Sequence, residues 1–171
     1  MKSMSIWTRA KFLMGLVVLT VMLAVASFAT LSAPSAHAAS TPKAHAIPHT
    51  ASDCEGGANG FVDISDSLSG TVQRSVDMGA GVTVTLESGQ VKGAQRGWAK
   101  ISGQTLQNDQ VWMDWTTDGG STWLQCGPFY VDHDGYSKTS AAKNTSSDPN
   151  YQFRACGSLA GVGDVKCTSW W

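Results

Sequence analysis

This 171-residue sequence lacks most of the signatures that identify catalytic and cofactor-binding proteins. It contains no G-x-S-x-G motif, which marks the nucleophile turn of many serine hydrolases, and no glycine-rich phosphate loop or cofactor fingerprint. Glutamate is scarce, since only Glu55 and Glu87 occur, whereas most glycosidases use two carboxylates about 5 to 10 Å apart. Asp114 and Asp132 are the alternative candidates for such a catalytic pair. These absences favour a non-enzymatic protein without a cofactor.

Metal-binding patterns are also missing. No C-x-x-C pair occurs, and His133 is the only histidine outside the N-terminal region. His133 lies between Asp132 and Asp134, a run that is typical of a tight turn. The alternatives are a catalytic base at His133 and a partial calcium site at the two aspartates. We expect a turn and no metal.

Basic residues are few and scattered. Three of the 12 lysines and arginines and none of the 13 acidic residues precede Ala39, so the remainder carries a net charge of −4 with histidine neutral. Nucleic-acid binding needs clustered basic side chains. Only Lys92, Arg96 and Lys100 lie close together, a pattern typical of a solvated face. We therefore do not expect this protein to bind nucleic acid.

The N-terminus has the pattern of a secretory signal. Basic residues precede an apolar run over residues 12–28, and Ala36-His37-Ala38 forms a small-x-small cleavage site. Thr20 and Ser27 interrupt the run, which argues against the alternative of an uncleaved membrane anchor. We predict a signal peptide over residues 1–38, a flexible leader over 39–53 and one domain over 54–171 that is secreted and extracellular, with no membrane association after cleavage.

Four cysteines follow the signal, namely Cys54, Cys126, Cys156 and Cys167. An even number in an exported chain indicates two disulfides, with three possible pairings. Cys156 and Cys167 flank a short stretch that has the character of a hairpin connection. We therefore favour the pairs Cys156–Cys167 and Cys54–Cys126.

The domain has an all-β pattern. Residues 82–87 alternate between apolar and polar side chains, which places Val82, Val84 and Leu86 on one face of a strand and Thr83, Thr85 and Glu87 on the other. Shorter strands are expected over residues 61–64, 71–76, 97–101, 109–115, 122–126, 129–131, 151–156 and 165–170, with a turn at 78–81 and a loop at 140–150. This spacing predicts a small antiparallel β-sandwich stabilised by disulfides, or a small barrel.

One turn sequence is highly specific. Residues 116–123 read Thr-Thr-Asp-Gly-Gly-Ser-Thr-Trp, which resembles the Asp-box hairpin of sialidase-type propellers and of several other β folds. The defining residues are Thr116, Asp118, Gly120, Thr122 and Trp123. The resemblance implies a structural hairpin in which Asp118 accepts hydrogen bonds from the turn and Gly120 adopts a positive φ. A propeller needs repeated blades, and this chain has one copy.

A second resemblance concerns the whole domain. A central strand that leads into a hairpin, followed by Tyr151 as a tyrosine-corner residue, resembles an immunoglobulin or fibronectin III-like sandwich. The sequence departs from antibody domains because no cysteine follows Tyr151 by two residues. Residues 98–171 also resemble small exported proteins of Gram-positive, actinomycete-like bacteria, which implies no particular activity.

Tryptophan is abundant after the signal, at positions 98, 112, 115, 123, 170 and 171. Alternation places Trp112 and Trp115 on opposite faces of one strand, so one of them is expected at the surface. Exposed tryptophans on a rigid β scaffold can stack on sugar rings. The first hypothesis is therefore a module that binds carbohydrate or a cell-envelope polymer through Trp98, Trp112, Trp170 and Trp171. The alternative for each ring is packing, with the last two capping the sandwich.

A second hypothesis is a protein-interaction module such as an inhibitor or effector. The loop between Cys156 and Cys167 carries Leu159 and Val162 among glycines. A loop closed by a disulfide loses less entropy when it binds a partner. An exposed apolar tip on this loop would favour the second hypothesis, and exposed tryptophan on a flat face would favour the first.

Overall fold

The computed structural model describes residues 46–171. The predicted signal peptide and the first part of the leader lie outside this range. The described residues form two β-sheets, which confirms the predicted sandwich. The first sheet contains, in spatial order, β1 (Ala46–His49), β7 (Trp123–Tyr130), β6 (Gln110–Thr116), β10 (Gln152–Ser158) and β11 (Val165–Cys167). Its strands are antiparallel except for β1, which runs parallel to β7.

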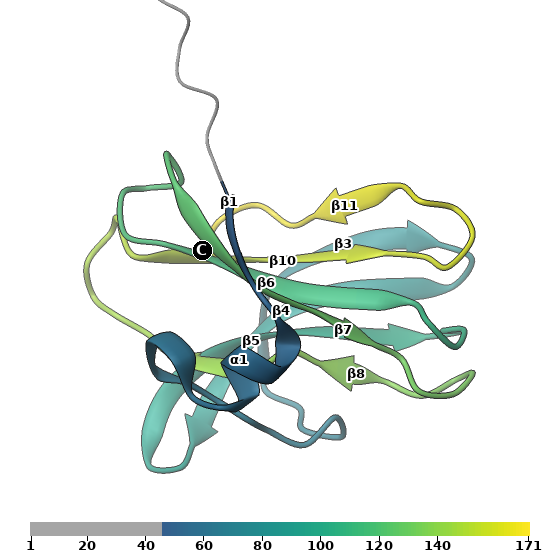
Figure 1. The fold of residues 1–171 in the computed structure, drawn as a ribbon, viewed down its shortest axis with the longest axis horizontal. Coiled ribbons are helices and arrows are strands. Elements are labelled where there is room, and N and C mark those ends of the chain that lie inside the picture. Colours follow the sequence, from purple (N-terminus) through teal and green to yellow (C-terminus); the bar gives the residue numbers. More distant parts are fainter. Residues whose placement is uncertain (1–45) are drawn as a thin grey trace, which may run out of the picture. The chain divides into compact units, whose positions relative to one another are not determined.

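The second sheet packs against the first. It contains, in spatial order, β2 (Phe61–Val62), β9 (Ala142–Asn144), β5 (Ala94–Gly103), β4 (Val82–Val91) and β3 (Thr71–Gly79), and β8 (Lys138–Thr139) also pairs with β5. In Figure 1 the strands β3, β4 and β5 lie behind β6, β7 and β10. Two short helices precede β2, the α-helix α1 (Ala51–Glu55) and a 3-10 helix over Ala58–Gly60.

Alternation in the strands places apolar side chains between the sheets. Val82, Val84 and Leu86 of β4 are buried in one core with Val111 and Met113 of β6. The strand predicted over residues 82–87 is therefore confirmed, and it extends to Val91. Burial of such side chains contributes roughly 1.5 to 3 kcal/mol each. This core fixes the position of β6 and its neighbours in the first sheet.

Some element boundaries differ from those expected. β3 continues to Gly79, so the turn into β4 consists of Ala80 and Gly81, both with positive φ. The segments expected as two strands over 122–126 and 129–131 form the single strand β7. The loop expected over 140–150 contains β9, because residues 142–144 pair with β2 and β5. β9 in particular forms by pairing with strands that are distant in the sequence, which its local pattern does not reveal.

The chain becomes regular earlier than expected. Residues 46–53 were expected to belong to a flexible leader, but they form β1 and the first part of α1. β1 supplies hydrogen-bonding partners to β7, which would otherwise be an edge strand. Thr50 caps α1 through a reciprocal pair of hydrogen bonds with Asp53. These tertiary contacts are invisible in the local composition of the segment.

Both predicted disulfides are present. Cys54 of α1 bonds to Cys126 of β7, and Cys156 of β10 bonds to Cys167 of β11. Two disulfides indicate an oxidising compartment. Neither bond joins the two sheets, in keeping with the departure from antibody domains at Tyr151. Among residues 46–171, neither helix has the length and hydropathy to span a membrane.

The segment between β2 and β3, residues 63–70, crosses the outer face of the second sheet. Lys100 Nζ donates to the Leu68 carbonyl at 2.6 Å, and the Gly70 amide donates to Glu87 Oε2 at 2.8 Å. Val62, Ile64 and Leu68 pack against Trp98 and form a second, smaller core with it. Glu87 was expected on a solvated face, but this segment covers it.

Candidate functional site

The C-terminal residues after β11 return along β10. The Thr168 amide donates to the Ala155 carbonyl at 2.8 Å, and Trp171 and Phe153 exchange two backbone hydrogen bonds of 2.9 Å. These bonds fix residues 168 and 171 on the edge of the first sheet. Trp170 lies between these two anchored positions.

The two terminal tryptophans have different surroundings. Trp171 packs against the main core, with its ring 6.4 Å from that of Phe153. Trp170 lies against Trp123, with ring centroids 6.3 Å apart, and against the guanidinium of Arg154 at 4.6 Å. Both residues are partly exposed. Both tryptophans were considered as caps over the end of the sandwich, and of the two only Trp171 packs against the main core.

An open pocket of about 430 Å³ lies beside these two rings. Its lining includes Arg74, Asp148, Tyr151, Gln152, Trp170 and Trp171. Arg74 comes from β3 of the second sheet, and Asp148 comes from the loop before β10. The pocket thus combines aromatic surface with groups that can form hydrogen bonds, which is the usual composition of a small-molecule site.

Hydrogen bonds hold the pocket wall in place. The Tyr151 hydroxyl donates to the Asn144 carbonyl at 2.9 Å, and burial raises the pKa of this phenol to about 12. Gln152 Nε2 donates to the Pro149 carbonyl at 2.9 Å. Asp148 Oδ1 accepts from the Asn150 amide at 2.9 Å. The wall is therefore preformed, and Arg74 at its rim is exposed.

The other two tryptophans proposed for ligand binding do not belong to this site. Trp98 is 1 % exposed, and a Cβ built on Gly70 would lie 2.6 Å from its ring. Trp112 is 8 % exposed, and Gly127 packs closely against it. The segment over residues 63–70 covers Trp98 on the outer face of the second sheet, and Trp112 is buried as well. Only Trp170 and Trp171 of the four predicted residues line the pocket.

The β6–β7 turn packs against this site. Asp118 accepts hydrogen bonds from the Thr122 amide at 2.9 Å, from the Thr122 hydroxyl at 2.7 Å and from the Thr116 hydroxyl at 2.7 Å. These bonds lower the pKa of Asp118 to about 2. Gly120 has a φ of +90°, and a Cβ built there would lie 2.9 Å from Nε1 of Trp170. Asp118 and Gly120 thus have the expected hydrogen bonds and positive φ. The turn contacts the pocket wall through Gly120, which lies against Trp170.

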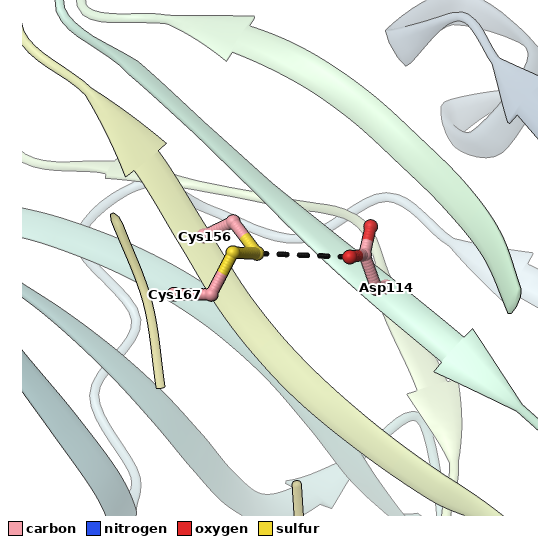
Figure 2. A group of neighbouring side chains, drawn as sticks. All are labelled: Asp114, Cys156 and Cys167. Carbon is pink, nitrogen blue, oxygen red and sulfur yellow. Dashed lines mark hydrogen bonds between the residues drawn. A yellow bond between two sulfur atoms is a disulfide. The ribbon is translucent and has the colours of Figure 1, made fainter. Parts of the chain in front are cut away.

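Asp114 lies beneath this surface, beside a disulfide. Figure 2 shows its carboxylate pointing at Cys156, with Oδ2 at 3.6 Å from the Cys156 sulfur. Within residues 46–171, Asp114, Cys156 and Cys167 form the one cluster with the close spacing of metal ligands. A disulfide sulfur carries no proton and is a poor ligand. The cluster therefore offers one carboxylate, which pairs with Arg154 instead.

The segment around His133 is a turn, as predicted. The Tyr136 amide donates to the His133 carbonyl at 3.2 Å. Asp132 pairs with Lys138 at 3.0 Å, and Asp134 Oδ1 accepts from the Gln107 amide at 2.7 Å. Both carboxylates thus have structural partners.

Two other surfaces stand out. A pocket of about 710 Å³ lies between α1 and β7, lined in part by His49, Glu55, Pro128 and Tyr130. Sequence reasoning missed this pocket because β1 and the first part of α1 lie in the segment expected as a leader. At the opposite edge of the first sheet, the β10–β11 loop exposes Val162.

The residues missed at the pocket itself are Arg74, Asp148 and Gln152. Their only sequence signal is polarity, which is common to most surface positions. Tyr151 was identified as a tyrosine-corner residue, and its hydroxyl does bond to upstream backbone. Comparison with known proteins adds no further residues: no family, curated protein or solved structure shows a significant match to this chain.

Proposed function

We propose that this protein is a secreted, non-catalytic module that binds a carbohydrate or cell-envelope polymer in the pocket formed by Trp170 and Trp171. The observation that carries the proposal is the open pocket of about 430 Å³ in which both rings adjoin polar side chains. Sugar rings present apolar C–H faces and a rim of hydroxyls. Aromatic rings match the faces, and groups such as Arg74, Asp148 and Gln152 match the hydroxyls.

The shape of the pocket also supports a polymer ligand. It is open rather than enclosed, and it lies at the edge of the first sheet beside the terminal residues. An open site admits an internal unit of a long chain, whereas an enclosed cavity would admit only a small molecule or a chain end. Export through the predicted signal peptide would place the protein where such polymers occur.

Pull-down on insoluble chitin, cellulose and bacterial cell-wall material tests this function. We expect the purified protein to be retained on at least one polymer, and Trp170→Ala and Arg74→Ala to weaken retention about ten-fold or more. Tyr136→Ala is the matched control, because Tyr136 is an exposed aromatic residue outside the pocket. Retention on none of the polymers, or equal loss in the control, would contradict the proposal.

A second function is favoured by the β10–β11 loop, namely binding of a protein partner. Val162 is 63 % exposed, and nearby Leu106 is 54 % exposed. Buried Asp109 joins their two loops, accepting from the amides of Ala160 and Leu106 at 2.8 Å each. A rigid, exposed apolar tip loses little entropy on binding and fits an apolar groove on a partner.

This second function predicts a saturable complex with one extracellular protein. Val162→Asp is expected to abolish the complex, measured by titration with the purified partner. Val72→Asp is the control, because Val72 is an exposed valine on β3, away from the β10–β11 loop. Equal affinity of the two variants would exclude the loop as the binding element.

A further inference from the structure

Arg154 occupies an unusual position on the outer face of the first sheet. Its guanidinium lies 4.6 Å from the ring of Trp123 and 4.6 Å from the ring of Trp170. The two rings are tilted by 63° to each other, with centroids 6.3 Å apart, and the guanidinium lies at the same distance from both. Cation–π attraction of this kind is favourable, and it strengthens as the contact is shielded from water. Arg154 therefore contacts both rings at once.

Asp114 holds Arg154 in this position. The two residues are directly opposite in the β6–β10 register, and both Nε and a terminal nitrogen of Arg154 lie 2.8 Å from Asp114 Oδ2. The Asp114 side chain is 3 % exposed, and its other oxygen has no hydrogen-bond partner. Burying a carboxylate with one oxygen unsatisfied costs stability. The pair therefore has no simple explanation as a stabilising ion pair.

Trp170 needs such a support. Backbone bonds anchor Thr168 and Trp171, but the Trp170 ring projects away from the main core that receives Trp171. Its ring contacts come from Arg154, Trp123 and the Gly120 turn. Arg154 is not among the residues that line the pocket. It can therefore influence a ligand only through the ring that it holds.

We propose that Arg154, fixed by Asp114, is a positioning residue that sets the Trp170 ring at the pocket wall. The proposal rests on the proposed carbohydrate function, because it assigns a role within that site. Arginine suits this role better than lysine, since its broad guanidinium can contact two rings and bond to a carboxylate at once. A lysine would keep the charge and lose these simultaneous contacts.

The test compares Arg154→Lys with wild type by two measurements. The first is the indole N–H resonance of Trp170, assigned with a Trp170→Phe variant. The second is retention on the polymer that the wild-type protein binds. We expect a shifted and broadened Trp170 resonance and about ten-fold weaker binding. The resonance of Trp98 should stay in place, because Trp98 lies on β5 of the other sheet and packs in the second, smaller core.

Arg96→Lys is the matched control, because Arg96 lies on β5 of the other sheet and bonds to the Val91 carbonyl. Unchanged Trp170 resonance and unchanged binding in Arg154→Lys would overturn the proposal, as would equal effects in the control. If the wild-type protein bound no polymer, the proposed function would fail by itself. The indole resonance would then still decide whether Arg154 positions the ring.

Discussion

Asp114 and Arg154 lie directly opposite each other on β6 and β10, and their side chains connect the interior to the surface. The carboxylate is buried beside the Cys156–Cys167 disulfide (Figure 2), whereas the guanidinium reaches the two tryptophan rings at the surface. A single ion pair thus connects a buried carboxylate of the first sheet to the tryptophan rings at the wall of the proposed site. This arrangement determines how the protein should respond to pH.

Stability should fall as the pH rises through the range in which Asp114 ionises. Burial outweighs the favourable effect of Arg154 and raises the pKa of Asp114 from 3.8 to about 6. The folded protein therefore binds this proton more tightly than the unfolded chain. Between about pH 4 and 6, ionisation of Asp114 should lower the free energy of unfolding by up to about 3 kcal/mol.

Denaturant unfolding between pH 4 and 7.5 measures this effect. The comparison is the wild-type protein against Asp114→Asn, in which the titrating group is absent. We expect the variant to lose the decline that begins near pH 4. The same pH dependence in both proteins would contradict a raised pKa at Asp114.

Asp118 should act in the opposite direction. Hydrogen bonds from Thr122 and Thr116 lower the pKa of Asp118 to about 2. Its contribution is therefore present above about pH 4 and is lost as the pH falls toward 2. We expect Asp118→Asn to lower the Tm at pH 7 and to lose less stability than wild type between pH 4 and 2. Asp164→Asn, in the exposed β10–β11 loop, is the control and should behave as wild type.

Gly120→Ala should destabilise the protein more than Gly135→Ala. Both glycines have positive φ, +90° and +78°, so both substitutions carry backbone strain of about 1 to 3 kcal/mol. Only a Cβ at Gly120 would meet another group, the Trp170 ring, whereas nothing lies within 4 Å at Gly135. The difference between the two variants in thermal unfolding isolates the Trp170 contact. Equal losses of stability in the two variants would show that the Trp170 ring moves aside without an energetic cost.

The two disulfides should contribute unequally. Cys54 and Cys126 are 72 residues apart, and Cys156 and Cys167 are 11 apart. Chain entropy then predicts about 4 kcal/mol for the first bond and about 3 kcal/mol for the second. Paired Cys→Ala substitutions and denaturant unfolding measure both values. A larger loss for the Cys156–Cys167 pair would contradict this order.

Local pattern was sufficient for much of the fold. Alternation over residues 82–87 identified the inward face of β4, because Val82, Val84 and Leu86 recur at the period of a strand. The short stretch between Cys156 and Cys167 indicated their pairing, which left Cys54 for Cys126. These inferences succeeded because the information lies within a few residues of each position.

The site required information that local pattern does not contain. Alternation places Trp112 and Trp115 on opposite faces of β6, but it does not show that Trp112 is buried. It also does not show that the segment over residues 63–70 covers Trp98. The pocket likewise joins Arg74 to Trp170, from opposite parts of the domain. Contacts between such distant positions depend on the order of strands in the sheets, and this order cannot be read from a local sequence pattern.

Titration of the indole resonances with soluble oligosaccharides is the most direct test of the proposed carbohydrate site. The ligands would be fragments of chitin, cellulose and cell-wall polymer, added to the labelled protein. We predict saturable shifts of Trp170 and Trp171 with one of these fragments, while the buried Trp98 and Trp112 stay unchanged. No shift with any fragment, or shifts confined to residues outside the pocket, would contradict the account.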